Sequence, residues 1–363
     1  MTRIAIDARK LADFGIGSYL RGLIGGFAAL DHETGFVLLA PREARYLLPA
    51  LPTNFEWVDE SAPGYSLREQ LALSRTLKRL APDLFHSPHY VLPAKTPARV
   101  VVTIHDLIHL VHPEFLPGRL ALPYARFMLK RAARRAARIL TVSAATAADL
   151  QSRLGVAADK IELIWNGVDE RFREPVDEAA IERELDATGL EPGYFLFVGN
   201  PKPHKNLERL LAAFAELHSP AARLVIVGES ATIRKESRSS RVISIGRVAD
   251  ERLPALFRGA LALVFPSLYE GFGLPVAEAM AAGVPVIASS TPAVAEIAGN
   301  AAEIVNPLDV SGWTAAMRRV AGDAELRRRL SAAGRERAAS FSWERAARRT
   351  LAVYRSVLAE PGK

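Results

Sequence analysis

The sequence predicts two α/β domains, each built on a doubly wound parallel sheet. Short apolar runs alternate with helical patterns along the whole chain, and most of these runs are continuously apolar. Strands of this kind are buried on both faces, as in parallel sheets that helices cover on each side. The pattern occurs once in each half of the 363 residues, a length that suits two domains.

The expected strands follow from these apolar runs. In the first half they are residues 3–8, 36–40, 83–87, 98–106, 137–143 and 161–167. In the second half they are residues 194–200, 222–229, 242–246, 261–267, 284–290 and 301–307. Helices are expected at 18–30, 207–218, 276–283 and 341–358. Gly283 closes the third of these helices as its C-cap.

A charged segment with two prolines, near residues 170–192, precedes a new strand and is expected to join the domains. The expected organisation is therefore a first domain at 1–172, a second domain at 173–340 and a C-terminal helical segment at 341–363.

Composition limits the classes of function. Without cysteine there are no disulfides and no thiolate metal sites. The apolar stretches have strand length and the N-terminus lacks a signal-peptide pattern, so we expect a cytoplasmic protein. The net charge of +7 would suit nucleic acid, anionic lipid or a phosphorylated substrate, but arginines on Ala-rich helices explain it equally well.

The segment 261–283 carries the most chemical information. A strand leads into a turn with Gly271 and Gly273 and then into a helix with Pro275 in its first turn, a typical phosphate cradle. Glu270 and Glu278 flank it, although carboxylates repel phosphate. Sugar hydroxyls on both sides of a diphosphate would explain them, since carboxylates accept paired hydrogen bonds from vicinal hydroxyls. The alternative is a capped surface helix with two solvated glutamates.

This segment resembles the signature of the retaining family-four glycosyltransferases, in which two glutamates with seven residues between them enclose Gly-Phe-Gly-Leu-Pro. Further segments resemble that family in the same order along the chain: 101–110, 139–150, 163–169, 194–214, 242–260 and 341–358. The resemblance implies the GT-B fold, in which two Rossmann-like domains face each other across a cleft. It also implies that the C-terminal helix crosses back to the first domain.

The resemblance assigns roles by position. Lys205 would grip the donor diphosphate, Glu270 the transferred hexose and Glu278 the ribose. The backbone of Arg247 and Val248 would bind the base, and His105 would lie beside the sugar. The remaining donor-binding positions are Gly15, Gly17, Asn200, Gly271, Phe272, Gly273 and Leu274. His105, Glu270 and Lys205 are the expected catalytic residues.

Asn200 and His204 depart from the family pattern, because arginine is common at both positions. Cationic stabilisation of the leaving phosphate would then be weaker, or shared with Lys202 or Arg9.

His105 and Asp106 end a buried strand, where ligands bind in such sheets. The structural alternative is a histidine that bonds to a backbone carbonyl. Other histidines lie near it in sequence: His86, His89, His109 and His112. None forms a helical ligand pair with a third partner, and the Asp-x-Asp motif is absent. We therefore expect neither a metal nor another cofactor.

The helical pattern at 125–138 is amphipathic and basic. Its cationic residues are expected to share one face: Arg126, Lys130, Arg131, Arg134, Arg135 and Arg138. This face could rest on anionic lipid that holds a lipid-linked acceptor. The alternative is a solvated helix with its Ala-Leu face on the sheet.

The sequence thus predicts a retaining, metal-independent hexosyltransferase, cytoplasmic or peripheral at the inner membrane face. A GDP- or UDP-hexose, with GDP-mannose favoured, would donate to a glycan or lipid-linked acceptor. The alternatives are another GT-B enzyme such as a nucleotide-sugar epimerase or a phosphorylase, a regulatory nucleotide-sugar sensor, and a nucleic-acid binder. Nucleic acid is not an expected partner, since few aromatics accompany the basic face.

Overall fold

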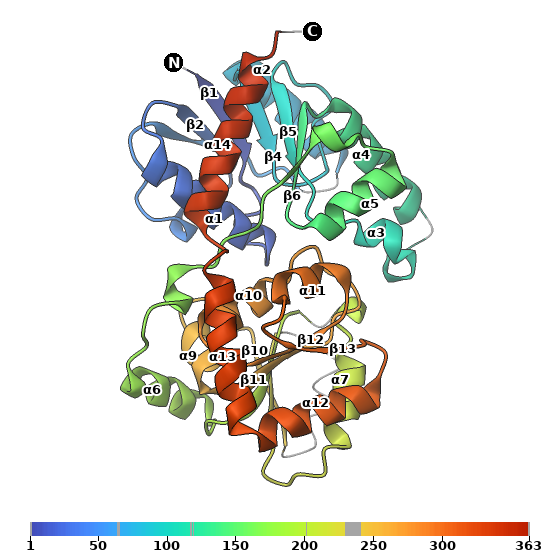
Figure 1. Ribbon diagram of the computed structural model, residues 1–363. Coiled ribbons are helices and arrows are strands. Elements are labelled where there is room, and N and C mark those ends of the chain that lie inside the picture. The colour runs from blue at the N-terminus through green and yellow to red at the C-terminus, as the bar shows by residue number, and fades with distance from the viewer. Residues whose placement is uncertain are drawn as a thin grey trace. The chain divides into compact units, whose positions relative to one another are not determined.

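The computed structural model describes residues 2–63, 66–116, 118, 120–200, 202–228 and 241–361. The chain forms two compact units (Figure 1). One comprises Met1–Gly167 with Ser342–Lys363, and the other comprises Val168–Phe341. The units divide between Gly167 and Val168, a few residues before the boundary expected after residue 172.

The first unit contains a parallel sheet in the order β3-β2-β1-β4-β5-β6-β7. Its strands are β1 (Arg3–Asp7), β2 (Gly35–Ala40), β3 (Phe55–Asp59), β4 (Leu84–Ser87), β5 (Arg99–Thr103), β6 (Arg138–Thr141) and β7 (Ile161–Leu163). Its helices are α1 (Ile16–Leu30), α2 (Leu67–Leu80), α3 (Ile108–Val111), α4 (Ala121–Arg135), α5 (Ala144–Leu154) and α14 (Trp343–Ala359). Short 3₁₀ helices lie at η1 (Arg42–Leu47), η2 (Pro113–Phe115) and η3 (Ala158–Lys160).

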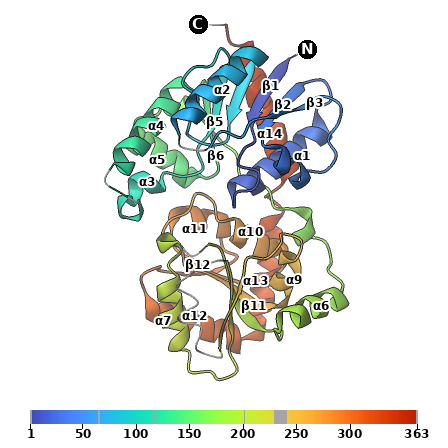
Figure 2. The ribbon, with the colours of Figure 1, turned by 180° about the vertical axis from the view of Figure 1, so that it is seen from behind.

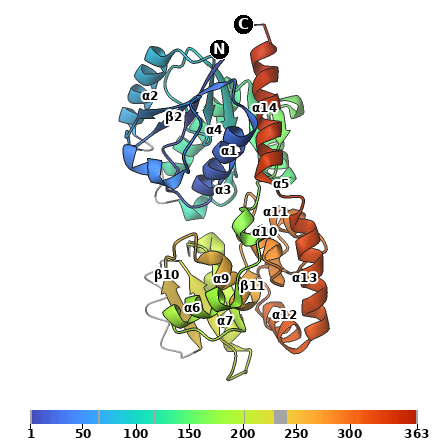
Figure 3. The same ribbon diagram turned by 90° about the vertical axis from the view of Figure 1, so that its left-hand side faces the viewer.

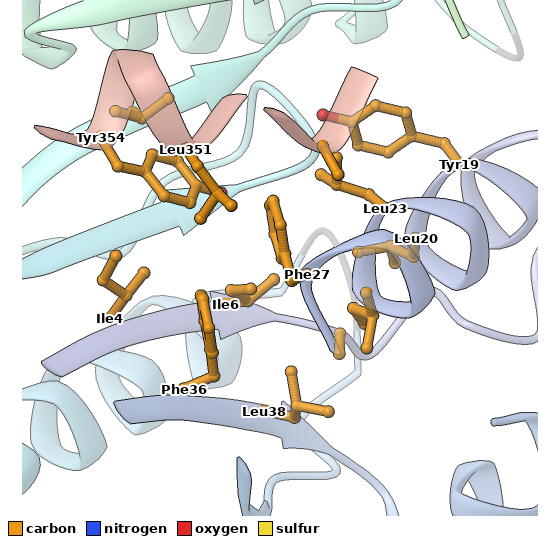
Figure 4. Close-up of a cluster of buried hydrophobic side chains, with 14 of the residues drawn as sticks. Ile4, Ile6, Tyr19, Leu20, Leu23, Phe27, Phe36, Leu38, Leu351 and Tyr354 are labelled. Atoms are coloured by element: carbon orange, nitrogen blue, oxygen red, sulfur yellow. The ribbon is translucent and has the colours of Figure 1, made fainter. Parts of the chain in front are cut away.

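Alternate residues of these strands face two separate cores, because side chains of a strand point to opposite faces. Ile4 and Ile6 pack under α1 and α14, where the ring of Phe27 stacks on that of Phe36 at a centroid distance of 5.3 Å (Figure 4). Ala5 instead faces the core formed with α2, α4 and α5. The two helical layers cover opposite faces of the sheet (Figures 1 and 2).

Strand β3 was not expected from the sequence. It lies at the edge of the sheet, and its residues are only partly buried or exposed. An edge strand needs little apolar sequence, because one side of its backbone and part of its surface meet solvent. The segment FEWVD therefore lacks the continuous apolar run that predicted the other strands.

Helix α14 packs directly on α1 (Figure 3). Two glycines of α1 permit the contact: a Cβ at Gly22 would lie 2.1 Å from the Trp343 ring, and one at Gly26 would lie 2.5 Å from Ala347 Cβ. The C-terminal segment thus belongs to the core of the first unit.

The second unit contains a parallel sheet in the order β10-β9-β8-β11-β12-β13. Its strands are β8 (Tyr194–Val198), β9 (Leu224–Val227), β10 (Val242–Gly246), β11 (Ala260–Phe265), β12 (Val286–Ser289) and β13 (Glu303–Val305). Its helices are α6 (Glu178–Thr188), α7 (Leu207–Ala215), α9 (Leu253–Gly259), α10 (Leu274–Ala281), α11 (Pro292–Ala298), α12 (Val310–Gly322) and α13 (Ala324–Ala338). The 3₁₀ helices are η4 (Glu170–Phe172) and η5 (Pro203–Lys205).

The expected basic helix needs one correction. Helix α4 ends at Arg135, and Arg138 begins β6, where its guanidinium forms an ion pair with Glu360 at 2.6 Å. Arg138 therefore does not share the face of the helix. The sequence pattern suggested a longer helix because Ala136 and Ala137 are compatible with a helix or a strand. In the structure the backbone is extended at Ala136, and this ends the helix.

No helix in the described ranges combines the length and the apolar character needed to cross a membrane.

Candidate active site

The strand order of the second sheet reverses between β8 and β11, and ligands bind at such switch points. Lys205 follows β8 in η5, and Glu270 follows β11. Lys205 Nζ donates to Glu270 Oε1 at 2.7 Å, and the two side chains are 16% and 13% exposed. The structure thus brings together two of the predicted catalytic residues as a largely buried ion pair.

Asn206 fixes the loops that carry this pair. Its backbone is left-handed, with φ of 59°, and its side-chain amide donates to the carbonyls of Pro266 and Pro307 at 3.0 and 2.7 Å. The Leu268 amide donates to the His204 carbonyl at 2.7 Å. The β8 and β11 loops are therefore held as one piece. Sequence reasoning missed Asn206, although asparagine is the residue most suited to this conformation after glycine.

The Gly-rich turn leads into α10 as expected. Gly273 has φ of 96° at the N-cap and Pro275 lies in the first turn. Leu274 and Glu278 are half-buried on this helix. Phe272 is buried, with its ring edge-on to Phe341 at 5.5 Å, so its side chain anchors the turn in the core.

Further residues of the expected donor site follow the ends of β8 and β10. Gly199 and Gly228 approach closely, since a Cβ at Gly228 would lie 2.1 Å from the Gly199 carbonyl oxygen. Asn200 follows Gly199, and Arg247 and Val248 follow Gly246. Arg247 is exposed and Val248 is buried. All three lie beyond the carboxyl ends of β8 and β10, the two strands that flank β9 in the sheet.

In the first unit, His105 follows β5 and is held on two sides. Its Nε2 lies 3.1 Å from the Pro88 carbonyl oxygen, and the Tyr19 ring lies edge-on at 4.8 Å. Burial lowers the pKa of His105 to about 4, although the bond to Pro88 opposes this. The ring is therefore neutral, with Nε2 as donor and Nδ1 as acceptor. His105 therefore forms the bond to a backbone carbonyl that the structural alternative expected, and this bond fixes its tautomer.

A buried chain of polar groups supports this histidine. Tyr354 Oη lies 2.5 Å from His86 Nδ1, and His86 Nε2 lies 2.8 Å from Thr103 Oγ1. The Tyr19 hydroxyl lies 2.8 Å from the same Thr103 oxygen. Burial lowers the pKa of His86 to about 3, so it is a neutral structural residue. Sequence reasoning missed this network because its members come from four separate elements.

Gly15 and Gly17 form the turn that begins α1. Gly15 is its N-cap, with φ of 52°, and a Cβ at Gly17 would lie 2.5 Å from the Leu11 carbonyl oxygen. The geometry of the turn therefore requires both glycines.

Arg9, one of the two residues considered for sharing the stabilisation of the leaving phosphate, is already paired with carboxylates. Its guanidinium donates to Asp7 Oδ1 and Oδ2 at 2.8 and 2.7 Å and to Glu69 Oε1 at 2.7 Å. Burial alone would lower the pKa of Arg9, but the bonds and charges of both carboxylates raise it. Two carboxylates thus compensate this cation, whereas Lys202 is exposed.

Among the described residues, no group of three or more His, Asp or Glu side chains has an arrangement that could hold a metal ion.

The two parallel sheets, with a Gly-rich helix start at the switch point of the second, are those of a GT-B glycosyltransferase. A family model described as "Glycosyltransferase Family 4" matches residues 15–172, and "Glycosyl transferases group 1" matches residues 181–337. The chain belongs to the family-4 glycosyltransferases.

Known relatives agree with this assignment. O-antigen chain mannosyltransferase B of Escherichia coli is 29% identical over 285 residues, 75% of this chain and 74% of its own. D-inositol 3-phosphate glycosyltransferase of a Nocardioides species is 30% identical over 315 residues, 77% of this chain and 68% of its own. The structure of sucrose-phosphate synthase from Thermosynechococcus elongatus has a TM-score of 0.81 at 22% identity, covering 99% of this chain and 100% of the other.

Proposed function

We propose that this glycosyltransferase moves a hexose, with mannose favoured, from a nucleotide-sugar to a glycan or lipid-linked acceptor. It retains the anomeric configuration and uses no metal. The ion pair between Lys205 and Glu270 carries the proposal, because it places a cation and a carboxylate together at the switch point of the second sheet. Relatives named as mannosyltransferases support mannose, and hence GDP-mannose as donor.

The donor would bind in the second unit. Lys205 stabilises the diphosphate as a point charge, and the start of α10 contributes backbone N–H groups and its dipole. Glu270 and Glu278 accept hydrogen bonds from the hexose and the ribose. The backbone beyond β10 binds the base, while the Phe272 side chain holds the turn from the core side.

The Nδ1 atom of neutral His105 would accept a hydrogen bond from a sugar hydroxyl, since Nε2 donates to the Pro88 carbonyl oxygen. In a front-face displacement, the bond from the anomeric carbon to the phosphate oxygen breaks. The acceptor oxygen bonds to the same face of that carbon, and its proton passes to the leaving phosphate. Configuration is thereby retained without a carboxylate nucleophile.

We place the enzyme at the inner face of a membrane, where a lipid-linked acceptor would be held. The first unit would bind this acceptor.

The test is a donor panel of GDP-mannose, GDP, UDP-glucose and UDP, read by thermal shift and slow donor hydrolysis, in EDTA and with added Mg²⁺. One nucleotide-sugar should stabilise the protein and be hydrolysed in EDTA. Glu278→Ala should lose both effects, while Glu336→Ala, an exposed glutamate on α13, should keep them. The anomeric configuration of a transfer product, measured by NMR, tests retention.

Binding without hydrolysis or transfer would indicate a nucleotide-sugar sensor, and conversion to an epimeric donor would indicate an epimerase. Failure of every donor, with and without metal, would overturn the proposal.

A further inference from the structure

One segment of the chain carries basic residues and no acidic ones. Residues 115–148 contain seven Lys and Arg residues and no Asp or Glu. This equals the formal net charge of +7, so the remaining 40 basic residues are balanced by the 40 acidic residues of the chain. Residues 318–355 carry the same net charge, but there eleven arginines are accompanied by four acidic residues. The segment around α4 differs because no carboxylate in it offsets its seven cations.

The inward face of α4 is already used. Ala125, Met128, Leu129 and Ala132 are buried in the core beneath the helix. Arg131 and Arg135 are also committed, because their guanidinium groups donate to the carbonyls of Pro93 and Ala94. These contacts involve no carboxylate, so they do not neutralise the two guanidinium charges. Both charges therefore add to the positive potential around α4.

Three cations of α4 lie on its exposed side: Arg126, Lys130 and Arg134. Within the described residues, none of the three forms an ion pair with a carboxylate. An isolated solvated helix is usually laced with charges of both signs, but this helix contains no acidic residue.

Large apolar side chains lie on the same exposed side. Leu120, at the N-cap of α4, is 84% exposed, Phe127 is 64% exposed and Tyr124 is 39% exposed. Their spacing of i, i+4 and i+7 places them on one stripe, which Lys130 and Arg134 continue at i+3 and i+7 from Phe127. The stripe therefore begins apolar and ends cationic, with Arg126 at its flank.

We propose that this stripe of α4 is a docking face for an anionic phospholipid bilayer. Leu120, Tyr124 and Phe127 enter the interface between headgroups and acyl chains, while Arg126, Lys130 and Arg134 pair with lipid phosphates. Interfacial helices combine these two kinds of side chain, and aromatic rings favour the headgroup level. The inference deepens the proposed membrane location by naming the surface that makes the contact.

Nucleic acid is the other polyanion that such a charge would attract, but it does not account for the exposed leucine and phenylalanine. In Figure 2, α4 lies beside α5 on the sheet face opposite α14. The docking face is thus separate from the α14 packing.

The test is co-flotation of the full chain with vesicles of phosphatidylcholine alone or of equal parts phosphatidylcholine and phosphatidylglycerol. Only the anionic vesicles should bind it, and salt should weaken binding. The triple variant R126Q/K130Q/R134Q should bind about a hundredfold more weakly, since each cation near an anionic surface contributes roughly fivefold. The variant L120S/F127S should also bind more weakly and become more sensitive to salt.

Two controls keep the test specific. R318Q/R329Q/R349Q removes three exposed arginines from other helices with the same change in net charge, and Y46S/L308S removes two exposed apolar side chains elsewhere. Both should bind vesicles as the wild type does. Equal loss in the control and α4 triples would reduce the effect to net charge and overturn the proposal, as would undiminished binding by the α4 triple.

Duplex DNA that displaces the protein from anionic vesicles at equal phosphate concentration would also overturn it, in favour of a nucleic-acid face. Donor hydrolysis measured without vesicles separates this inference from the catalytic proposal. The α4 triple should hydrolyse donor as the wild type does, because its residues lie outside the donor site. If neither the wild type nor any variant hydrolysed donor, the enzyme function would be refuted. The vesicle measurements would still test the docking face.

Discussion

At the scale of single residues, the paired charges of Lys205 and Glu270 serve both the fold and the proposed chemistry. Their distance of 2.7 Å and low exposure mean that each compensates the charge of the other. Removing one partner from such a pair leaves an uncompensated, poorly solvated charge, whereas removing both does not. The two residues should therefore behave as a unit in stability and in catalysis.

We expect Lys205→Met to reduce donor turnover at least hundredfold, because a cation on the developing phosphate charge is lost. Lys205→Met and Glu270→Gln should each lower the unfolding midpoint, and the double variant should lose less stability than the sum of both. The coupling should be about 1–3 kcal/mol in a double-mutant cycle. Strict additivity in stability would contradict a coupled pair.

At the scale of elements, the approach of α14 to α1 depends on the small residues of α1. Gly22 and Gly26 face Trp343 and Ala347, while a Cβ at Gly25 would meet nothing within 4 Å. Alanine favours a helix over glycine at all three positions. Only the docking of α14 distinguishes them.

Gly22→Ala should therefore destabilise the first unit by about 1–3 kcal/mol through overpacking against Trp343. Gly25→Ala, three residues away on the same helix, should stabilise it by about 0.5–1 kcal/mol through helix propensity. Urea unfolding followed by the fluorescence of the chain measures both. If the two substitutions shift stability in the same direction, α14 does not pack as described.

At the scale of the whole molecule, buried neutral histidines make stability depend on pH. Burial lowers the pKa of His86 to about 3 and, despite the opposing Pro88 bond, that of His105 to about 4. In the unfolded chain each would titrate near an ordinary pKa of about 6.5. The unfolded state thus binds more protons below that pH, and acid favours unfolding.

Stability should be insensitive to these histidines above neutral pH and should fall as the pH drops below about 6.5, with each contributing up to about 1.4 kcal/mol per pH unit. Thermal unfolding midpoints at neutral pH and through the acid range measure the effect. His105→Asn should flatten the slope, whereas a change of the exposed His218 to Asn should not. A midpoint constant across the acid range would exclude buried neutral histidines.

The sequence by itself determined most of the fold. Continuous apolar runs such as LALVF and helical periodicity report which residues leave water, and that is sufficient for two parallel sheets. The spacing of Glu270 and Glu278 identified the family, because glycine, proline and carboxylate requirements are local at a helix start. Strand β3 was not predicted, because a strand at the edge of the sheet needs no continuous apolar run.

The tertiary structure alone decided what the buried groups contact. It paired Lys205 with Glu270, committed Arg9 to two carboxylates, and joined His86 to Tyr354 across 268 positions. It also separated Arg138 from the α4 face. Periodicity states that a side chain is buried or exposed but not which partner meets it, because that partner is set by topology between distant segments.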